Sequence, residues 1–363
     1  MRYKLSDLFE LQMGKTPSRN NPNYWDSNDY SWVSISDMSS YDKYVSGTKE
    51  YISEQAVKES GIKTIPANTV IMSFKLSIGK TAITTGPIFS NEAIMAFIDK
   101  KTTTIDPEYI FYLFSGKNWD EGSNKAVMGK TLNKATLSNI EVDIPSLDIQ
   151  KERIEKLNKI SILIADKKQQ LNQLDELIKA RFVEMFGDRN YDIKPFKDVC
   201  DELFAGGDVK KDRTVKVADA NHPYEVFTNG EKDDGLYGYT DYARVVKPSI
   251  TISGRGTIGF CLVRTKPFYP AIRLIVATPK ENLVTPSYLK YFIDSKDYSG
   301  RGASIPQLTI PMIKDEPVPV PPIDKQKEFE TFIAQVDKSK FAVQKSLEKT
   351  QQLFDSLMQE YFG

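Results

Sequence analysis

A long helical pattern occurs twice in this chain, and the duplication limits the possible folds more than any other feature. The first copy runs from Gln150 to Gly187 and the second from Gln326 to Gly363. The copies align without a gap, each beginning with Gln-Lys-Glu and ending with Phe-Gly. A proline-containing extended run precedes each copy. Because such self-similarity indicates a structural repeat, the sequence predicts the order globule, helix, globule, helix.

Each copy carries one apolar stripe of the kind that packs helix against helix. Apolar side chains recur at every seventh position in the first copy and, except at Lys340, in the second, as in a coiled coil. The residues expected to pack the helices together are Leu157, Ile164, Leu171 and Ile178 in the first copy and Ile333, Leu347 and Phe354 in the second. A helix of about 36 residues is roughly 54 Å long and cannot bury such a stripe alone. We therefore expect the two helices to pack as an antiparallel coiled coil. Two surface helices on separate cores are the alternative.

The segments 1–149 and 188–325 are expected to be two globular units built on one plan. Alternating apolar residues and turn-forming residues predict mainly β structure in both. Segment 250–259 matches segment 70–79 in its pattern of turns and apolar positions. The expected fold class is therefore α+β, with two β-rich domains separated by two long helices. The predicted boundaries are 1–149, 150–187, 188–325 and 326–363.

Composition and motifs argue against most kinds of enzyme. The single histidine excludes a histidine-rich metal site, and the two cysteines share no motif spacing. The series Gly254-x-Gly256-x-x-Gly259 is followed by a predicted strand, whereas dinucleotide binding needs a helix there. Three Gly-Lys-Thr turns lack the preceding glycine of a P-loop. We predict no catalytic residue and no metal ligand.

The charge balance and hydropathy set further limits. The chain has 49 basic and 49 acidic side chains, so a nucleic-acid site would have to consist of local basic patches. No apolar run approaches 18 residues, and the N-terminus does not resemble a signal peptide. We expect a cytoplasmic protein without a membrane segment.

Loops at matching places in both globules combine basic residues with amides, hydroxyls and aromatic rings. Lysine and arginine neutralise phosphates, while arginine and amide side chains form paired hydrogen bonds with base edges. The candidate DNA-binding residues of the first globule are Lys15, Arg19, Asn21, Lys75, Lys80, Lys130, Asn133 and Lys134. Those of the second are Lys210, Lys211, Arg213, Asn229, Arg255, Arg301 and Gln307. Ordinary solvated loops would have a similar composition.

The duplicated architecture resembles the DNA-specificity subunit of type I restriction-modification enzymes. The resemblance covers essentially the whole chain and is carried by the helix openings Ile-Pro-Ser-Leu-Asp-Ile-Gln-Lys-Glu and Pro-Pro-Ile-Asp-Lys-Gln-Lys-Glu, and by the Phe-Gly endings. It implies that each globule is a target-recognition domain for one half of a split, asymmetric double-stranded DNA sequence. It also implies that the helices act as a spacer and dock DNA-adenine methyltransferase subunits, with a restriction subunit completing the complex.

The resemblance further implies that this chain is not catalytic and binds no cofactor of its own. S-adenosylmethionine, ATP and Mg²⁺ are expected in the partner subunits. Two other interpretations stay open at this point. One is a coiled-coil scaffold that never contacts DNA, and the other is a free-standing enzyme that uses the glycine turn at 254–259.

Overall fold

A computed structural model of the chain describes residues 1–363 except 76, 120–123, 127–128, 188–189 and 299–306, and only the backbone of 124–126 and 129–131. The chain divides into two compact units. Unit 1 comprises residues 1–167 and 346–363, and unit 2 comprises 168–345. Each unit combines one β-rich domain with one half of each long helix. The four-part division expected from the sequence therefore stays a prediction, while the contacts group each domain with the helix segments packed on it.

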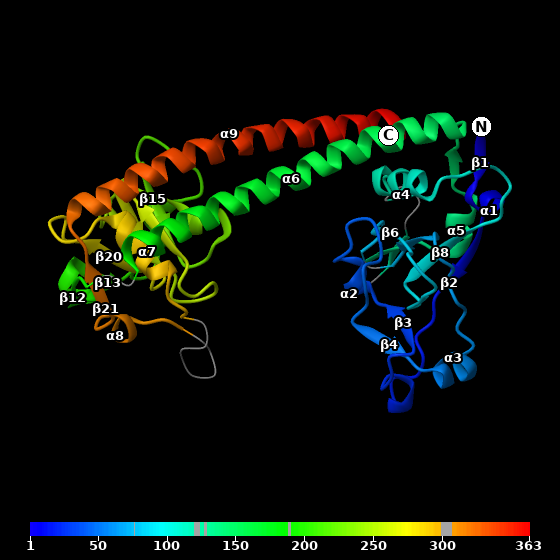
Figure 1. Ribbon diagram of the computed structural model, residues 1–363, viewed down its shortest axis with the longest axis horizontal. Helices are drawn as coiled ribbons and strands as arrows, with labels where there is room; N and C mark the ends of the chain where they lie inside the picture. The colour runs from blue at the N-terminus through cyan, green and yellow to red at the C-terminus, as the bar shows by residue number, and fades with distance from the viewer. Residues whose placement is uncertain (76, 120–123, 127–128, 188–189, 299–306) are drawn as a thin grey trace. The chain divides into compact units, whose positions relative to one another are not determined.

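The β-rich domain of unit 1 is built on two small sheets (Figure 1). The central sheet is antiparallel, in the order β2-β8-β5-β6, with β2 (Phe9–Met13), β5 (Val70–Ser73), β6 (Thr81–Ile83) and β8 (Ile94–Asp99). The second sheet has the order β4-β3-β7, with β3 (Tyr30–Val33), β4 (Glu50–Ile52) and β7 (Phe89–Ser90). Two further antiparallel strand pairs join β1 (Arg2–Lys4) to β11 (Glu141–Asp143) and β9 (Asn124–Ala126) to β10 (Gly129–Thr131). The helices are α1 (Leu5–Leu8), α2 (Ile35–Met38), α3 (Glu54–Ser60), α4 (Pro107–Gly116) and α5 (Lys134–Asn139).

The β-rich domain of unit 2 repeats this plan. Its central antiparallel sheet has the order β13-β20-β17-β18, with β13 (Cys200–Ala205), β17 (Ser249–Ile252), β18 (Cys261–Arg264) and β20 (Ile275–Pro279). The second sheet has the order β14-β16-β15-β19, with β14 (Thr214–Val215), β15 (Tyr224–Phe227), β16 (Leu236–Thr240) and β19 (Phe268–Pro270). Strand β12 (Asp192–Pro195) pairs with β21 (Pro317–Val320), as β1 pairs with β11. Helices α7 (Pro286–Asp294) and α8 (Ile310–Ile313) take the places of α4 and α5.

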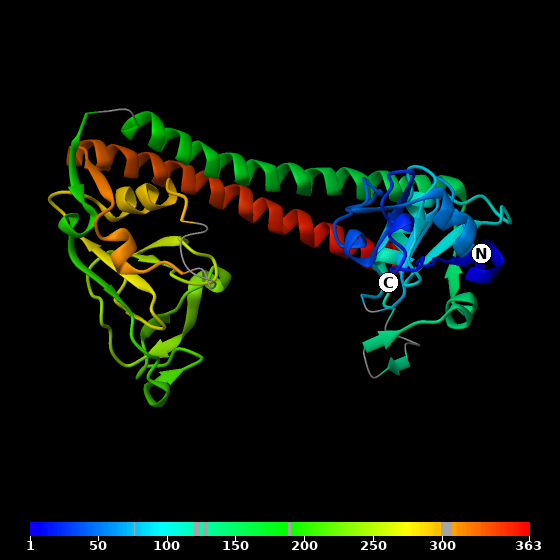
Figure 2. The same ribbon diagram turned by 90° about the horizontal axis from the view of Figure 1, so that it is seen from below.

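The two long helices are α6 (Leu147–Phe186) and α9 (Ile323–Phe362). They begin three residues before the positions expected from the sequence, because the backbone N–H of Gln150 already donates to the carbonyl of Ser146. Within each unit their segments lie side by side and antiparallel (Figures 1 and 2). In unit 1 the Arg153 guanidinium donates to the carbonyl of Tyr361 at 3.1 Å. In unit 2 the Lys340 ammonium donates to Asp175 at 2.6 Å. The predicted α+β fold with an antiparallel helix pair is confirmed.

The ends of the helices complete the two main cores. The core of unit 1 contains Leu157, and Phe354 packs against it. The core of unit 2 contains Ile178, and Ile333 packs against it. Of the remaining residues expected in the stripe, Ile164, Leu171 and Leu347 are half-buried. Because most helical stability in proteins comes from such packing, each domain and its helix segments should unfold together.

One glutamine near the start of each long helix joins that helix to its domain. Gln150 is fully buried, and its amide nitrogen donates to the carbonyls of Thr104 and Pro145, both at 3.0 Å. Its amide oxygen accepts from the backbone N–H of Asp106 at 2.9 Å. Gln326 forms the same three hydrogen bonds in unit 2. Its amide nitrogen donates to the carbonyls of Leu283 and Pro321, and its amide oxygen accepts from the N–H of Thr285 at 2.8 Å. The glutamine of the duplicated motif thus attaches each long helix to its domain by hydrogen bonds.

Candidate nucleic-acid interface

The central sheets of the two β-rich domains contain equivalent hairpins. In unit 1 it joins β5 to β6, where the N–H of Gly79 donates to the carbonyl of Ser73 at 2.9 Å. In unit 2 it joins β17 to β18, where the N–H of Gly259 donates to the carbonyl of Ser253, also at 2.9 Å. Both glycines have positive φ, +89° and +85°. The alignment of 70–79 with 250–259 predicted from the sequence is therefore the structural alignment.

This geometry also explains the glycine series of the second hairpin. Gly256 and Gly259 have positive φ, and strand β18 follows directly. A phosphate-binding turn of the dinucleotide type would need a helix at this point. The series is a tight β turn. Lys75 and Arg255 occupy equivalent places on the two hairpins, so each domain presents one basic side chain from the same scaffold.

One glycine in each domain allows a loop to lie close against the backbone at the end of a neighbouring strand. A Cβ atom on Gly14 would lie 2.2 Å from the carbonyl oxygen of Asn91, and one on Gly206 would lie 2.6 Å from that of Pro270. Any side chain at these positions would therefore force the backbones apart. The loops that follow β2 and β13 are in this way held against the ends of β7 and β19. These loops thus lie at the same end of each central sheet as the β5–β6 and β17–β18 hairpins.

In unit 1, several candidates are engaged in contacts within the domain. The guanidinium of Arg19 forms a two-bond ion pair with Glu50 and lies 3.7 Å from the centre of the Trp25 ring. Asn21 and Asn133 cap the helical turns that follow them. Lys15 donates to the carbonyl of Ser60, and Lys80 donates to the hydroxyl of Ser39. Lys75 is half-buried beside the Phe74 ring, Lys134 is exposed at the start of α5, and the side chain of Lys130 lies outside the described residues.

In unit 2, the structure brings three candidates from separate loops together. Arg255 donates to the side-chain oxygen of Gln307 at 3.3 Å. The side-chain oxygen of Asn229 accepts from the N–H of Gly254 at 2.7 Å, next to Arg255. Arg213 is held by Asp241 through bonds of 2.7 to 2.9 Å. Lys210 and Lys211 are exposed, and Arg301 lies outside the described residues. The sequence pattern predicted Asn229, Arg255 and Gln307 as candidates but did not indicate that they meet.

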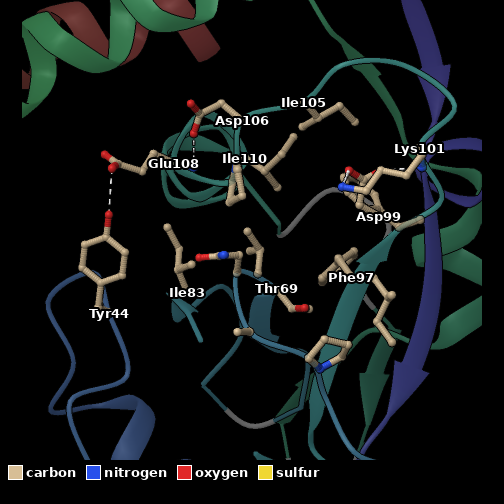
Figure 3. A pocket seen from close by; sticks show the side chains of 17 residues that line it. Tyr44, Thr69, Ile83, Phe97, Asp99, Lys101, Ile105, Asp106, Glu108 and Ile110 are labelled. Carbon is tan, nitrogen blue, oxygen red and sulfur yellow. Dashed lines mark hydrogen bonds and ion pairs between the residues drawn. The ribbon is translucent and has the colours of Figure 1, made fainter. Parts of the chain in front are cut away.

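A pocket of about 630 Å³ in unit 1 does not belong to this surface. It lies between the central sheet and the start of α4, and none of the candidate residues lines it (Figure 3). The carboxylates of Asp99, Asp106 and Glu108 line it, with Lys101 as its basic residue. Lys101 is paired with Asp99 at 2.9 Å. An excess of negative charge makes the pocket unsuited to phosphate groups.

The carboxylate of Glu108 instead belongs to a network that joins the domain to α6. Lys43 donates to Glu108 at 2.8 Å, as does the amide of Asn158 on α6. The Tyr44 hydroxyl donates to the same carboxylate at 2.7 Å (Figure 3). Burial would raise the pKa of Glu108, but the hydrogen bonds from Lys43, Asn158 and Tyr44 outweigh burial and leave this pKa below its usual value. The network is therefore charged at neutral pH and fixes the domain on the helix.

No group of three or more His, Cys, Asp or Glu side chains in the described ranges is arranged to hold a metal ion. No helix among the residues that the structure covers is long and apolar enough to cross a membrane.

Comparison with known proteins finds relatives over most of the chain. The family model of the type I restriction modification DNA specificity domain matches residues 1–176 and again residues 189–353. The MjaIX specificity subunit of Methanocaldococcus jannaschii is 30% identical over 199 residues, which cover 54% of this chain and 44% of that protein. A putative type I specificity subunit of Mycoplasma pneumoniae is 28% identical over 205 residues, covering 54% of this chain and 55% of that protein. The matches thus span about half the length of these two relatives.

Other matches extend over nearly the full length. The EcoprrI specificity subunit of Escherichia coli is 23% identical over 355 residues, covering 89% of this chain and 84% of that protein. A solved chain from the type I R-M system superposes with a TM-score of 0.64 at 13% identity, covering 100% of this chain and 97% of that one. The S subunit of the M. genitalium system gives 0.54 at 12% identity, with 100% and 96% coverage. These structures share the fold. The twofold match of the family model and the duplicated hairpin scaffold agree: this chain belongs to the type I restriction modification DNA specificity domain family.

Proposed function

We propose that the chain is the non-catalytic DNA-recognition subunit of a type I restriction-modification complex. Each β-rich domain reads one half of a split, asymmetric sequence in double-stranded DNA. The observation that carries this proposal is the pair of equivalent hairpins, which hold Lys75 and Arg255 on the same backbone scaffold but among different neighbouring side chains. Two domains that share a backbone fold but differ in their loop side chains can recognise two different DNA sequences.

The long helices are proposed to dock DNA-adenine methyltransferase subunits. Large apolar side chains on them stay exposed, including Ile162 (60%), Leu177 (47%), Phe341 (71%) and Leu353 (51%). These exposed apolar side chains would be covered by the partner subunits. The partner subunits, including a restriction subunit, would bring S-adenosylmethionine, ATP and Mg²⁺, which this chain is not expected to bind.

The helices also suit a spacer between the two readers. A continuous helix of 40 residues is about 60 Å long. One turn of duplex DNA measures about 34–36 Å, so readers attached near opposite ends of such helices would contact half-sites with unread bases between them.

The test is to co-express the chain with the methyltransferase encoded beside it in a host without adenine methylation. Methylated adenines are then mapped across the host genome. The proposal predicts methylation at one split, asymmetric motif. Co-purification of the two proteins without methylation would contradict DNA recognition and would support a purely structural scaffold.

Lys75 provides a smaller test of the interface within unit 1. Replacing Lys75 with alanine should weaken binding of the complex to its DNA about fivefold and reduce the salt slope by about 1, as expected for one lost phosphate contact. The control is Lys100→Ala, because Lys100 follows the opposite end of the central sheet and donates to the carbonyl of Ser6. Equal effects of the two substitutions on binding at several salt concentrations would remove Lys75 from the interface.

A further inference from the structure

A tight turn in unit 2 violates the usual sequence rules for its geometry. The N–H of Leu274 donates to the carbonyl of Ala271 at 3.1 Å, which closes a four-residue turn. Both central residues, Ile272 and Arg273, have positive φ, +50° and +59°. Turns of this kind strongly prefer Asn-Gly or Gly-Gly, and a β-branched residue at positive φ is a real outlier. The chain therefore keeps two side chains here at the cost of backbone strain.

The surroundings force the turn into this conformation. The N–H groups of Ile272 and Arg273 donate to the carbonyls of Gly207 and Gly206 at 2.7 and 2.9 Å. The side-chain nitrogen of Asn229 donates to the carbonyl of Ile272 at 2.5 Å. Ile272 nevertheless remains 43% exposed, and Arg273 is exposed as well. The two side chains are exposed, so packing in the core does not account for a strained pair at this position, and such backbone outliers cluster at functional sites.

Asn229 links this turn to the second hairpin. Its nitrogen holds the turn, and its oxygen accepts from Gly254 at 2.7 Å. Arg255 follows Gly254 and donates to Gln307 at 3.3 Å. A hollow of about 240 Å³ is lined by Arg255, Arg273 and Gln307. No carboxylate lines it, and neither arginine has an ion-pair partner among the described residues.

We propose that Arg255, Ile272 and Arg273 form the base-reading surface of the second domain, with Arg255 directed by Gln307 onto a guanine. An arginine recognises guanine by two hydrogen bonds to O6 and N7, and an apolar side chain recognises the methyl group of thymine. Asn229 is a positioning residue, since both ends of its amide are used within the domain. This inference rests on the proposed function and names the chemistry of its second reader.

The first domain differs at the equivalent turn, which supports a role in specificity. There the N–H of Ile94 donates to the carbonyl of Asn91 at 3.2 Å, and neither Glu92 nor Ala93 has a positive φ. Glu92 accepts a hydrogen bond from Thr16. One scaffold position thus carries a carboxylate in one domain and a strained, exposed Ile-Arg pair in the other. Carboxylates accept from cytosine, so such a difference would change the base that is read.

The double substitution Ile272→Asn/Arg273→Gly tests this role because it installs the residues that the turn prefers. A purely structural turn would gain stability without other consequences. We expect the Tm of the full chain to rise by roughly 2–6 °C. In complex with the methyltransferase, binding to a duplex with the mapped motif should weaken about tenfold or more, and discrimination should be lost in one half-site only.

A second substitution, Arg255→Lys, keeps the charge but removes the two-bond geometry. It should leave non-specific DNA affinity within about twofold and lower discrimination at a guanine position about 5- to 150-fold. The matched control is Lys197→Ala, because Lys197 precedes the opposite end of the central sheet and pairs with Asp315. An unchanged motif in both variants, or a lower Tm with loss of both half-sites, would overturn the inference. If the unaltered complex methylates no split motif, the proposed function itself fails, and this inference with it.

Discussion

Replacing Phe329 with alanine is expected to destabilise unit 2 by about 3–5 kcal/mol. Phe329 on α9 is fully buried and contacts the rings of Phe182 and Phe186 on α6, with centroids 5.5 Å away in each case. It also contacts Tyr291 of α7 at 5.3 Å. Its removal would leave a cavity where both long helices meet the domain. Because aromatic pairs add to area burial, the loss should fall at the upper end of that range.

Hydrogen exchange followed segment by segment measures this effect and assigns it to a unit. Amides of α7 and of the first half of α9 should lose protection, while those of α4 should keep it, since α4 belongs to the other unit. The control is Phe341→Ala on the same helix, because Phe341 is 71% exposed and should change stability by less than about 0.5 kcal/mol. Similar exchange in the two variants would show that the aromatic cluster does not hold α9 on the domain.

Replacing Gln150 with alanine should destabilise unit 1 by roughly 3 kcal/mol or more. The substitution leaves the carbonyls of Thr104 and Pro145 and the N–H of Asp106 without their partner. Each partly buried group left unsatisfied costs about 1–3 kcal/mol. Gln150→Glu should be at least as harmful, because it keeps the oxygen, removes both donated bonds and buries a charge.

The same exchange experiment, now observed at α4 and the start of α6, tests this prediction. Gln352→Ala serves as the control in unit 1, because Gln352 is exposed on α9. Gln150→Met fills a similar volume without any hydrogen bond. If the methionine variant were as stable as the native chain, packing rather than the amide would explain why the glutamine recurs in both helix openings.

The helix pair and the two-domain plan were predictable because they depend on periodic patterns. A stripe with a seven-residue period needs a partner helix, and a duplicated helix implies a duplicated domain. The alignment of the hairpins was predictable too, since Gly79 and Gly259 occupy a turn that requires positive φ. The heptad period and the turn glycines can both be recognised from short stretches of sequence.

The site was less predictable, because side-chain chemistry does not show which partner a residue finds. Arg19 and Arg213 look as free as Arg255 in the sequence, yet Glu50 and Asp241 bind them in the fold. The turn at Ile272 contains no glycine, asparagine or proline at its central positions, so no turn signal marked it. Tertiary contacts impose its geometry. The failure of a local rule at an exposed site is itself a sign of function.

The most direct test of the central claim is a domain exchange read out by methylation mapping. Residues 188–325 would be replaced with the corresponding domain of the Escherichia coli EcoprrI specificity subunit, which aligns over 355 residues, while both long helices are kept. The account predicts that one half of the methylated motif changes and that the other half stays as in the unaltered complex. A change in both halves, or in neither, would contradict the assignment of one half-site to each domain.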